Sequence, residues 1–150
     1  MAEKKNVDEI IRVMFVVWGG ILFSQFILAV FAYTTKPQLL YVDLSKPALG
    51  AEPIPIIVMG LIAVSILIAS FFVRNSLIAA AISTRDTQKL QSAYIVGMAM
   101  SESISLIGVV AAIVFEYQYF VVFFLIAIVA IVLHRPKMTS ILAATFEDKI

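Results

Sequence analysis

The sequence contains no cysteine and only one histidine. Without cysteine, the chain has no disulfide framework, no covalently attached haem and no thiolate metal site. His134 has neither a second histidine nor a carboxylate beside it in the sequence, so we do not expect a metal site or a proton relay there. Charged residues make up only 14% of the chain and the net charge is +1, which argues against nucleic acid or an acidic substrate as partner.

The residue sets that support catalysis are also missing. The sequence has no serine, histidine and acid arrangement, no cluster of metal-ligand residues and no glycine-rich phosphate loop. We therefore expect neither an enzyme nor a protein that carries a cofactor.

Apolar residues dominate what is present. They make up 62% of the 150 residues, and the mean hydropathy is +1.03, which is more apolar surface than a soluble domain of this size buries. Four apolar runs follow one another, and the first three are long enough to cross ~30 Å of hydrocarbon as helices. The sequence predicts one all-α membrane domain over residues 1–150, a four-span transmembrane helical bundle, with spans at about residues 14–33, 54–73, 93–115 and 117–133.

The basic residues are distributed unevenly between the predicted loops. Nine of the 11 lysines and arginines lie in the N-terminal segment, the second loop and the C-terminal segment, and the first loop holds the other two, Lys36 and Lys46. The positive-inside rule then places both termini in the cytoplasm. The compact four-span format and the first span, which follows Lys4 and Lys5 and is too long for a signal peptide, favour a bacterial inner (cytoplasmic) membrane.

Shorter signals mark the ends of the predicted elements. Asn6 and Glu9 have the spacing of a capping box, so we expect the first helix to begin near Val7. Prolines interrupt residues 34–53, which we interpret as a solvated connector rather than a cap over the bundle. After the fourth span, apolar residues at helical spacing predict an interfacial helix over residues 138–147.

The leading functional candidate is Glu102, the only charged residue in the third run. A carboxylate at mid-bilayer costs a few kcal/mol, so a chain usually keeps one where it meets a partner, a cavity or an ion path. The same helix has a row of small residues about a quarter turn away, which we expect to pack against a neighbouring helix: Gly97, Ser101, Ser105, Gly108 and Ala112.

Depth along the helices indicates which side chains can reach this acid. Counted from the inner membrane edge, Gln25 lies ~16 Å deep and Glu102 ~14 Å deep, and Ser65 falls near the same plane. A protonated Glu102 that hydrogen-bonds to Gln25 or Ser65 is one possibility. A cation site that uses Glu102, Ser103 and a further oxygen is a second, because Na⁺ prefers oxygen ligands. A neutral acid that only holds helices together is a third.

One segment resembles a known family. In KLQSAYIVGMAMSESISLIG, residues 89–108, Lys89, Gly97, Ala99 and Glu102 are similar to the ion-carrying helix of proteolipid subunit c of rotary ATP synthases. The resemblance implies that Glu102 carries H⁺ or Na⁺, that Ser103 assists Na⁺ binding, and that the preceding polar loop, which contains Arg85, is cytoplasmic.

The sequence is therefore consistent with two alternative functions. In the first, a proteolipid-like protein takes up H⁺ or Na⁺ at Glu102, with Ser103, Gln25 and Ser65 as ion-binding helpers. In the second, the chain is a non-transporting accessory or scaffold subunit whose glutamate sits in a structural helix contact. In both, the partners are the lipid bilayer and either copies of the chain in a homo-oligomer or a larger membrane complex.

Overall fold

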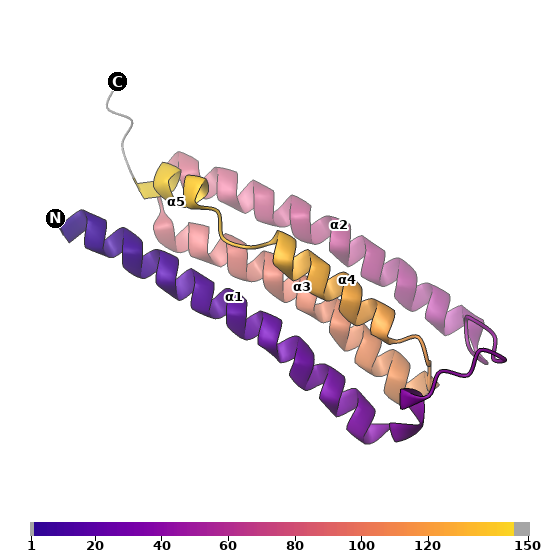
Figure 1. Cartoon of the computed structure of the whole chain (residues 1–150). Coiled ribbons are helices and arrows are strands. Elements are labelled where there is room, and N and C mark those ends of the chain that lie inside the picture. The colour runs from indigo at the N-terminus through magenta and orange to yellow at the C-terminus, as the bar shows by residue number, and fades with distance from the viewer. Residues whose placement is uncertain (1, 146–150) are drawn as a thin grey trace.

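The computed structural model describes the backbone of residues 2–145 and the side chains of residues 8–145. Within that range the fold is entirely helical (Figure 1). The elements are α1 (Ala2–Thr35), a 3₁₀ turn η1 (Pro37–Leu40), α2 (Pro53–Thr84), α3 (Thr87–Phe115), α4 (Val121–Leu133) and α5 (Met138–Thr145).

Three helices, α1, α2 and α3, are long and apolar enough to cross a membrane. The short helices α4 and α5 pass the same test only together, as one span bent by 45°. The 13 residues of α4 extend only ~20 Å, which is less than the thickness of a hydrocarbon core. The prediction of an all-α helical bundle is confirmed, and three helices, or up to four spans if the bent pair counts as one, are long and apolar enough to cross a membrane.

Several predicted boundaries differ from the observed ones. Helix α1 begins at Ala2, earlier than the predicted start near Val7. Helix α4 begins at Val121 instead of residue 117, because Glu116 takes a left-handed conformation (φ 47°) that ends α3 and residues 117–120 form a turn. A helix, α5, is observed within the range 138–147 where an interfacial helix was predicted, and the last two predicted positions lie outside the described residues.

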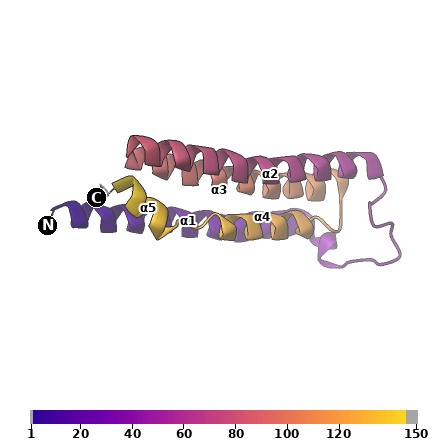
Figure 2. The same cartoon turned by 90° about the horizontal axis from the view of Figure 1, so that it is seen from above.

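Helix α3 is central, because it packs against α1, α2, α4 and α5. Figure 2 shows two layers, with α2 beside α3 in one and α1 beside α4 in the other. The row of small residues on α3 is buried, as predicted, and two glycines explain why. A Cβ at Gly108 would lie 2.8 Å from Phe123 Cβ, and one at Gly97 would lie 3.1 Å from Arg74 Cβ. Small residues thus let α4 and α2 approach α3 closely.

The outer faces of the bundle are apolar. Phe26 on α1 is 64% exposed, and Ile54 and Phe72 on α2 are 73% and 76% exposed. Large apolar side chains exposed over whole helix faces fit contact with lipid and not with water.

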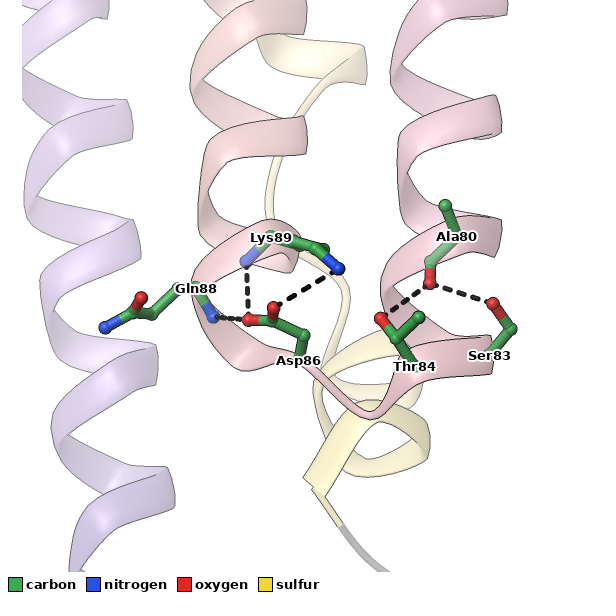
Figure 3. Close-up of polar contacts among 6 residues, drawn as sticks. All are labelled: Ala80, Ser83, Thr84, Asp86, Gln88 and Lys89. Atoms are coloured by element: carbon green, nitrogen blue, oxygen red, sulfur yellow. Dashed lines mark hydrogen bonds and ion pairs between the residues drawn. The ribbon is translucent and has the colours of Figure 1, made fainter.

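A tight turn joins α2 to α3 at the end of the bundle that holds α5 and the beginning of α1 (Figures 1 and 3). Arg85 is left-handed (φ 52°), and the Asp86 carboxylate accepts hydrogen bonds at 3.0 Å from the backbone N–H groups of Gln88 and Lys89. The pKa of Asp86 is lowered, mainly by the Lys89 backbone N–H, with further lowering by Gln88 and by the Lys89 charge. Asp86 therefore caps the central helix in its ionised form.

At the opposite end, the long loop is attached to the turn between α3 and α4. The Gln118 side chain accepts from Asp43 N and donates to Asp43 O, both at 3.0 Å, and Leu39 is buried. Lys36 forms an ion pair with Glu116, and its hydrogen bond and charge lower the pKa of that carboxyl. The loop is largely exposed, as a connector should be, but these contacts fix it against the bundle.

Candidate functional site

Glu102 lies next to the midpoint of α3 and contacts α1. Its Oε1 accepts a hydrogen bond from Ser24 Oγ, across the contact between the two helices. Ser24 precedes Gln25, so the polar pair on α1 meets the acid at the depth that residue counting predicted.

Gln25 is 1% exposed, and its carboxamide is hydrogen-bonded on both sides. Its Oε1 accepts from Ser105 Oγ on α3, and its Nε2 donates to Ile21 O and to Ser24 Oγ, both at 3.3 Å. The result is a continuous chain of hydrogen bonds from Ser105 through Gln25 and Ser24 to Glu102. It connects α1 to α3 at two points, one turn apart on α3.

The hydroxyl of Ser24 has more acceptors than it has protons. Besides Glu102 Oε1, its Oγ lies 2.7 Å from Ile21 O, yet a hydroxyl carries a single proton. If Glu102 is ionised, Ser24 donates to the carboxylate. If Glu102 is protonated, the carboxyl donates to Ser24 Oγ, and Ser24 turns its proton to Ile21 O. Rotation of one hydroxyl satisfies both protonation states.

The second carboxyl oxygen of Glu102 faces outward. Within residues 8–145 every buried side-chain nitrogen and oxygen has a hydrogen-bond partner, whereas Oε2 of the half-buried Glu102 has none. Oε2 must therefore reach the surface of the bundle, next to the midpoint of α3. This geometry leaves one oxygen for an exchangeable proton or for a neighbouring molecule.

Two of the four predicted site residues lie outside this chain of hydrogen bonds. Ser103 Oγ donates to Met100 O, one turn back on its own helix, at 2.6 Å. Ser65 is exposed on α2 and donates to Leu61 O at 2.8 Å, so it does not meet Glu102 or Gln25 as depth alone had indicated. Depth fixes a plane but not a direction, and α2 packs on another side of α3 than α1 does.

Sequence reasoning missed Ser24 and Ser105. Ser105 was assigned only to the row of small residues on α3. Ser24 was not considered, because its neighbour Gln25 was taken as the polar residue at that depth. A usable signal did exist, because Ser24 and Gln25 are adjacent polar residues at the depth of Glu102.

A second buried polar cluster joins α2 to the end of α4. Arg74 NH1 lies 2.7 Å from His134 Nδ1 and donates to Leu133 O at 3.2 Å, and His134 Nε2 lies 3.0 Å from Ser70 Oγ. A guanidinium only donates, so Nδ1 must accept, and the imidazole is neutral with its proton on Nε2. Ser70 in turn donates to Leu67 O at 2.7 Å.

The charge of Arg74 is stabilised without a carboxylate. Within residues 8–145 it forms no ion pair, and its remaining donors reach Asn75 Oδ1 while its guanidinium lies 5.5 Å from the centre of the Phe71 ring. The predicted second span ends at residue 73, which leaves Arg74 in the following loop, but Arg74 lies inside α2 and is 6% exposed. Both ring nitrogens of His134 are hydrogen-bonded, so this cluster connects α2 to the end of α4.

Metal-ligand geometry is not found at either cluster. The described residues hold no group of three or more histidine, cysteine, aspartate or glutamate side chains close enough to bind a metal ion. Comparison with protein-family models, with curated proteins and with solved structures finds no match to this chain.

Proposed function

We propose that the chain is a four-span inner-membrane protein with both termini in the cytoplasm, in which Glu102 reversibly binds a proton at mid-membrane. The observation that carries the proposal is the position of Ser24 Oγ between Glu102 Oε1 and Ile21 O. A carboxyl whose two protonation states are both satisfied by one hydroxyl rotation can gain or lose a proton without repacking the helices.

The surroundings favour H⁺ over Na⁺. A Na⁺ ion needs several converging oxygens, but Gln25 directs its Nε2 donor toward Ser24, and the hydroxyls of Ser103 and Ser65 are hydrogen-bonded to their own helices. Glu102 Oε1 and Ser24 Oγ alone make a poor cation site. The same two atoms are enough for a proton.

The exposed Oε2 gives the proton a route out of the bundle. A carboxyl at the outer surface of a helix bundle can exchange its proton with a neighbouring copy or with another subunit of a membrane complex. The resemblance of residues 89–108 to proteolipid subunit c likewise implies that Glu102 carries an ion. We therefore propose a proteolipid-like role in which Glu102 exchanges its proton with a group on a neighbouring copy or on another subunit.

Carbodiimide labelling tests the proton site, because dicyclohexylcarbodiimide reacts with protonated carboxyls in apolar surroundings. We expect one label per chain at Glu102, with a rate that falls as the pH rises. Glu102→Gln should abolish the label, and Glu116→Gln, which removes an exposed carboxyl at the end of α3, should leave it unchanged. Absence of labelling at every pH would contradict the proposal.

Two further measurements separate H⁺ from Na⁺ and test the role of Ser24. Adding Na⁺ should not protect Glu102 from the reagent, and clear protection would overturn the assignment to H⁺. Ser24→Ala should change the labelling rate at Glu102, because the carboxyl then loses the hydroxyl that hydrogen-bonds to it in either protonation state.

A scaffold function is the second candidate, and one observation favours it. Two hydrogen bonds join α1 to α3, one between Ser24 and Glu102 and one from Ser105 to Gln25. Both hold the helices together whether Glu102 is protonated or ionised. On this alternative, Glu102→Gln would leave expression, assembly and activity nearly intact, since an amide also bonds to a hydroxyl. Loss of proton-dependent activity with assembly preserved would reject it.

A further inference from the structure

A groove of about 460 Å³ lies between the first part of α1 and α5, away from Glu102. Its walls are mostly apolar, with Ile11 and Phe15 from α1 and Met138 and Ile141 from α5. Arg135 and Lys137, on the segment that leads into α5, also line it.

Both cations are exposed. Neither Arg135 nor Lys137 forms an ion pair in the part of the chain that the structure describes. The segment that carries them is nevertheless fixed, because Lys137 N donates to the hydroxyl of the buried Tyr94 at 3.1 Å and Pro136 is buried. Two positive charges that have no ion-pair partner among the described residues are thus held beside an apolar wall.

The groove lies where the hydrocarbon of a bilayer ends. Phe15 precedes Thr35, the last residue of α1, by 20 positions, which is ~30 Å along a helix and equals the thickness of a hydrocarbon core. Ile11 lies one turn farther out, at headgroup depth. Phe15 is 45% exposed and Met138 is 53% exposed, so apolar surface remains open beside the cations.

We propose that this groove binds an anionic phospholipid of the leaflet that faces the start of α1 and α5. The phosphate lies between Arg135 and Lys137, and an acyl chain lies along Phe15 and Met138. The charges match an anionic headgroup, and the adjoining apolar wall at the membrane boundary matches a lipid chain rather than a free phosphate ion. Binding does not depend on the protonation of Glu102.

The chain carries its own probe for this site. Trp18 is its only tryptophan, and its ring centre lies 6.1 Å from that of Phe15. The full chain is reconstituted in phosphatidylcholine vesicles that contain a small fraction of phosphatidylglycerol with brominated acyl chains, which quench tryptophan fluorescence on contact. The matched measurement uses the same fraction of brominated phosphatidylcholine.

We expect brominated phosphatidylglycerol to quench Trp18 at lower mole fractions than brominated phosphatidylcholine. The expected preference is about fivefold for each cation, since a basic residue near an anionic surface contributes ~1 kcal/mol. Arg135→Gln and Lys137→Gln should each reduce the preference, and the double variant should remove it. Arg12→Gln removes an exposed positive charge from the same end of α1 but not from the groove, so it should keep most of the preference.

Equal quenching by the two brominated lipids would overturn the proposal. An equal reduction by Arg12→Gln would also overturn it, because the preference would then come from general attraction to a basic surface. Circular dichroism of each variant confirms that its helices are intact. Addition of inorganic phosphate should not compete with the lipid, and competition would assign the site to the free ion.

Discussion

At the scale of single residues, the chemistry of the membrane core lies in four side chains on two helices. Glu102, Ser24, Gln25 and Ser105 satisfy one another, and Ser24 can serve either protonation state of the acid. The sequence identified Glu102 and Gln25 because a charge and an amide are conspicuous in apolar runs. Serines are not conspicuous, since their hydroxyls often bond to their own helix, as those of Ser65 and Ser103 do.

Replacement of Gln25 measures how much the polar chain contributes to stability. Gln25→Leu leaves Ser105 without its acceptor and Ser24 without one of its donors, so we expect the free energy of unfolding to fall by about 1–2 kcal/mol. Unfolding of the purified protein by sodium dodecyl sulfate, followed by circular dichroism, gives this value. Ser65→Ala is the matched control, because Ser65 is exposed and bonds only within α2. If Gln25→Leu left the free energy of unfolding unchanged, the chain of hydrogen bonds would contribute no stability.

At the scale of helices, small residues on α3 determine how close its neighbours lie. Gly108→Val introduces a Cβ that would lie 2.8 Å from Phe123 Cβ and 3.2 Å from Phe120 O, so α4 must move away. We expect a loss of about 1–3 kcal/mol in the same unfolding assay. Gly60→Ala meets no atom within 4 Å and should be neutral or slightly stabilising. Destabilisation by Gly60→Ala of the same size would show that close packing is not the cause.

The Asp86 cap of α3 makes the stability of the fold depend on pH in a direction that can be stated. The folded-state pKa of Asp86 lies below its ordinary value of 3.8, so its stabilising effect is present above that value and is lost as the pH falls through the lower, folded-state pKa. Asp86→Ala should lower the thermal unfolding midpoint at neutral pH and reduce the loss of stability on acidification. Asp86→Asn keeps the cap in uncharged form, so its midpoint at neutral pH should stay close to that of the unmodified chain.

Helix interiors were predictable, whereas helix ends were only partly so. Residues 54–73 and 93–115 lie within α2 and α3 because uninterrupted apolar runs permit no other structure in a membrane. The start of α4 was missed because it depends on the left-handed conformation of Glu116. Few non-glycine residues adopt this conformation, and the residue type does not predict it.

At the scale of the whole molecule, α3 contacts every other α-helix, with α2 beside it in its own layer and α1 in the other layer (Figure 2). The sequence predicted the helices but not their order in space. Polar and small residues indicate which faces are buried, but which neighbour covers each face depends on how all the helices pack together. Gln25 accordingly reaches Glu102 only through Ser24 and not by the direct hydrogen bond that was predicted, and Ser65 does not reach it.

The absence of cysteine makes the proposed topology simple to test. Single cysteines at Ala2 and at Ser45, in a chain that has no others, can be labelled with a membrane-impermeant maleimide in intact cells. Both termini are proposed to be cytoplasmic, so only Ser45→Cys should react before the membrane is permeabilised, and Thr139→Cys on α5 should behave like Ala2→Cys. Reaction of Ala2→Cys in intact cells would invert the topology.

The hydrogen bond between Gln25 and Ser105 joins residues that are 80 positions apart. A ribosome that adds ~5–20 residues per second makes the second partner about 4–16 seconds after the first. During biosynthesis, then, α1 enters the lipid with an amide that has no partner on another helix, and it must wait for α3. Any factor that delays translation between these helices prolongs the interval in which α1 is open to capture by a chaperone, by another membrane protein or by the quality-control proteases of the cell.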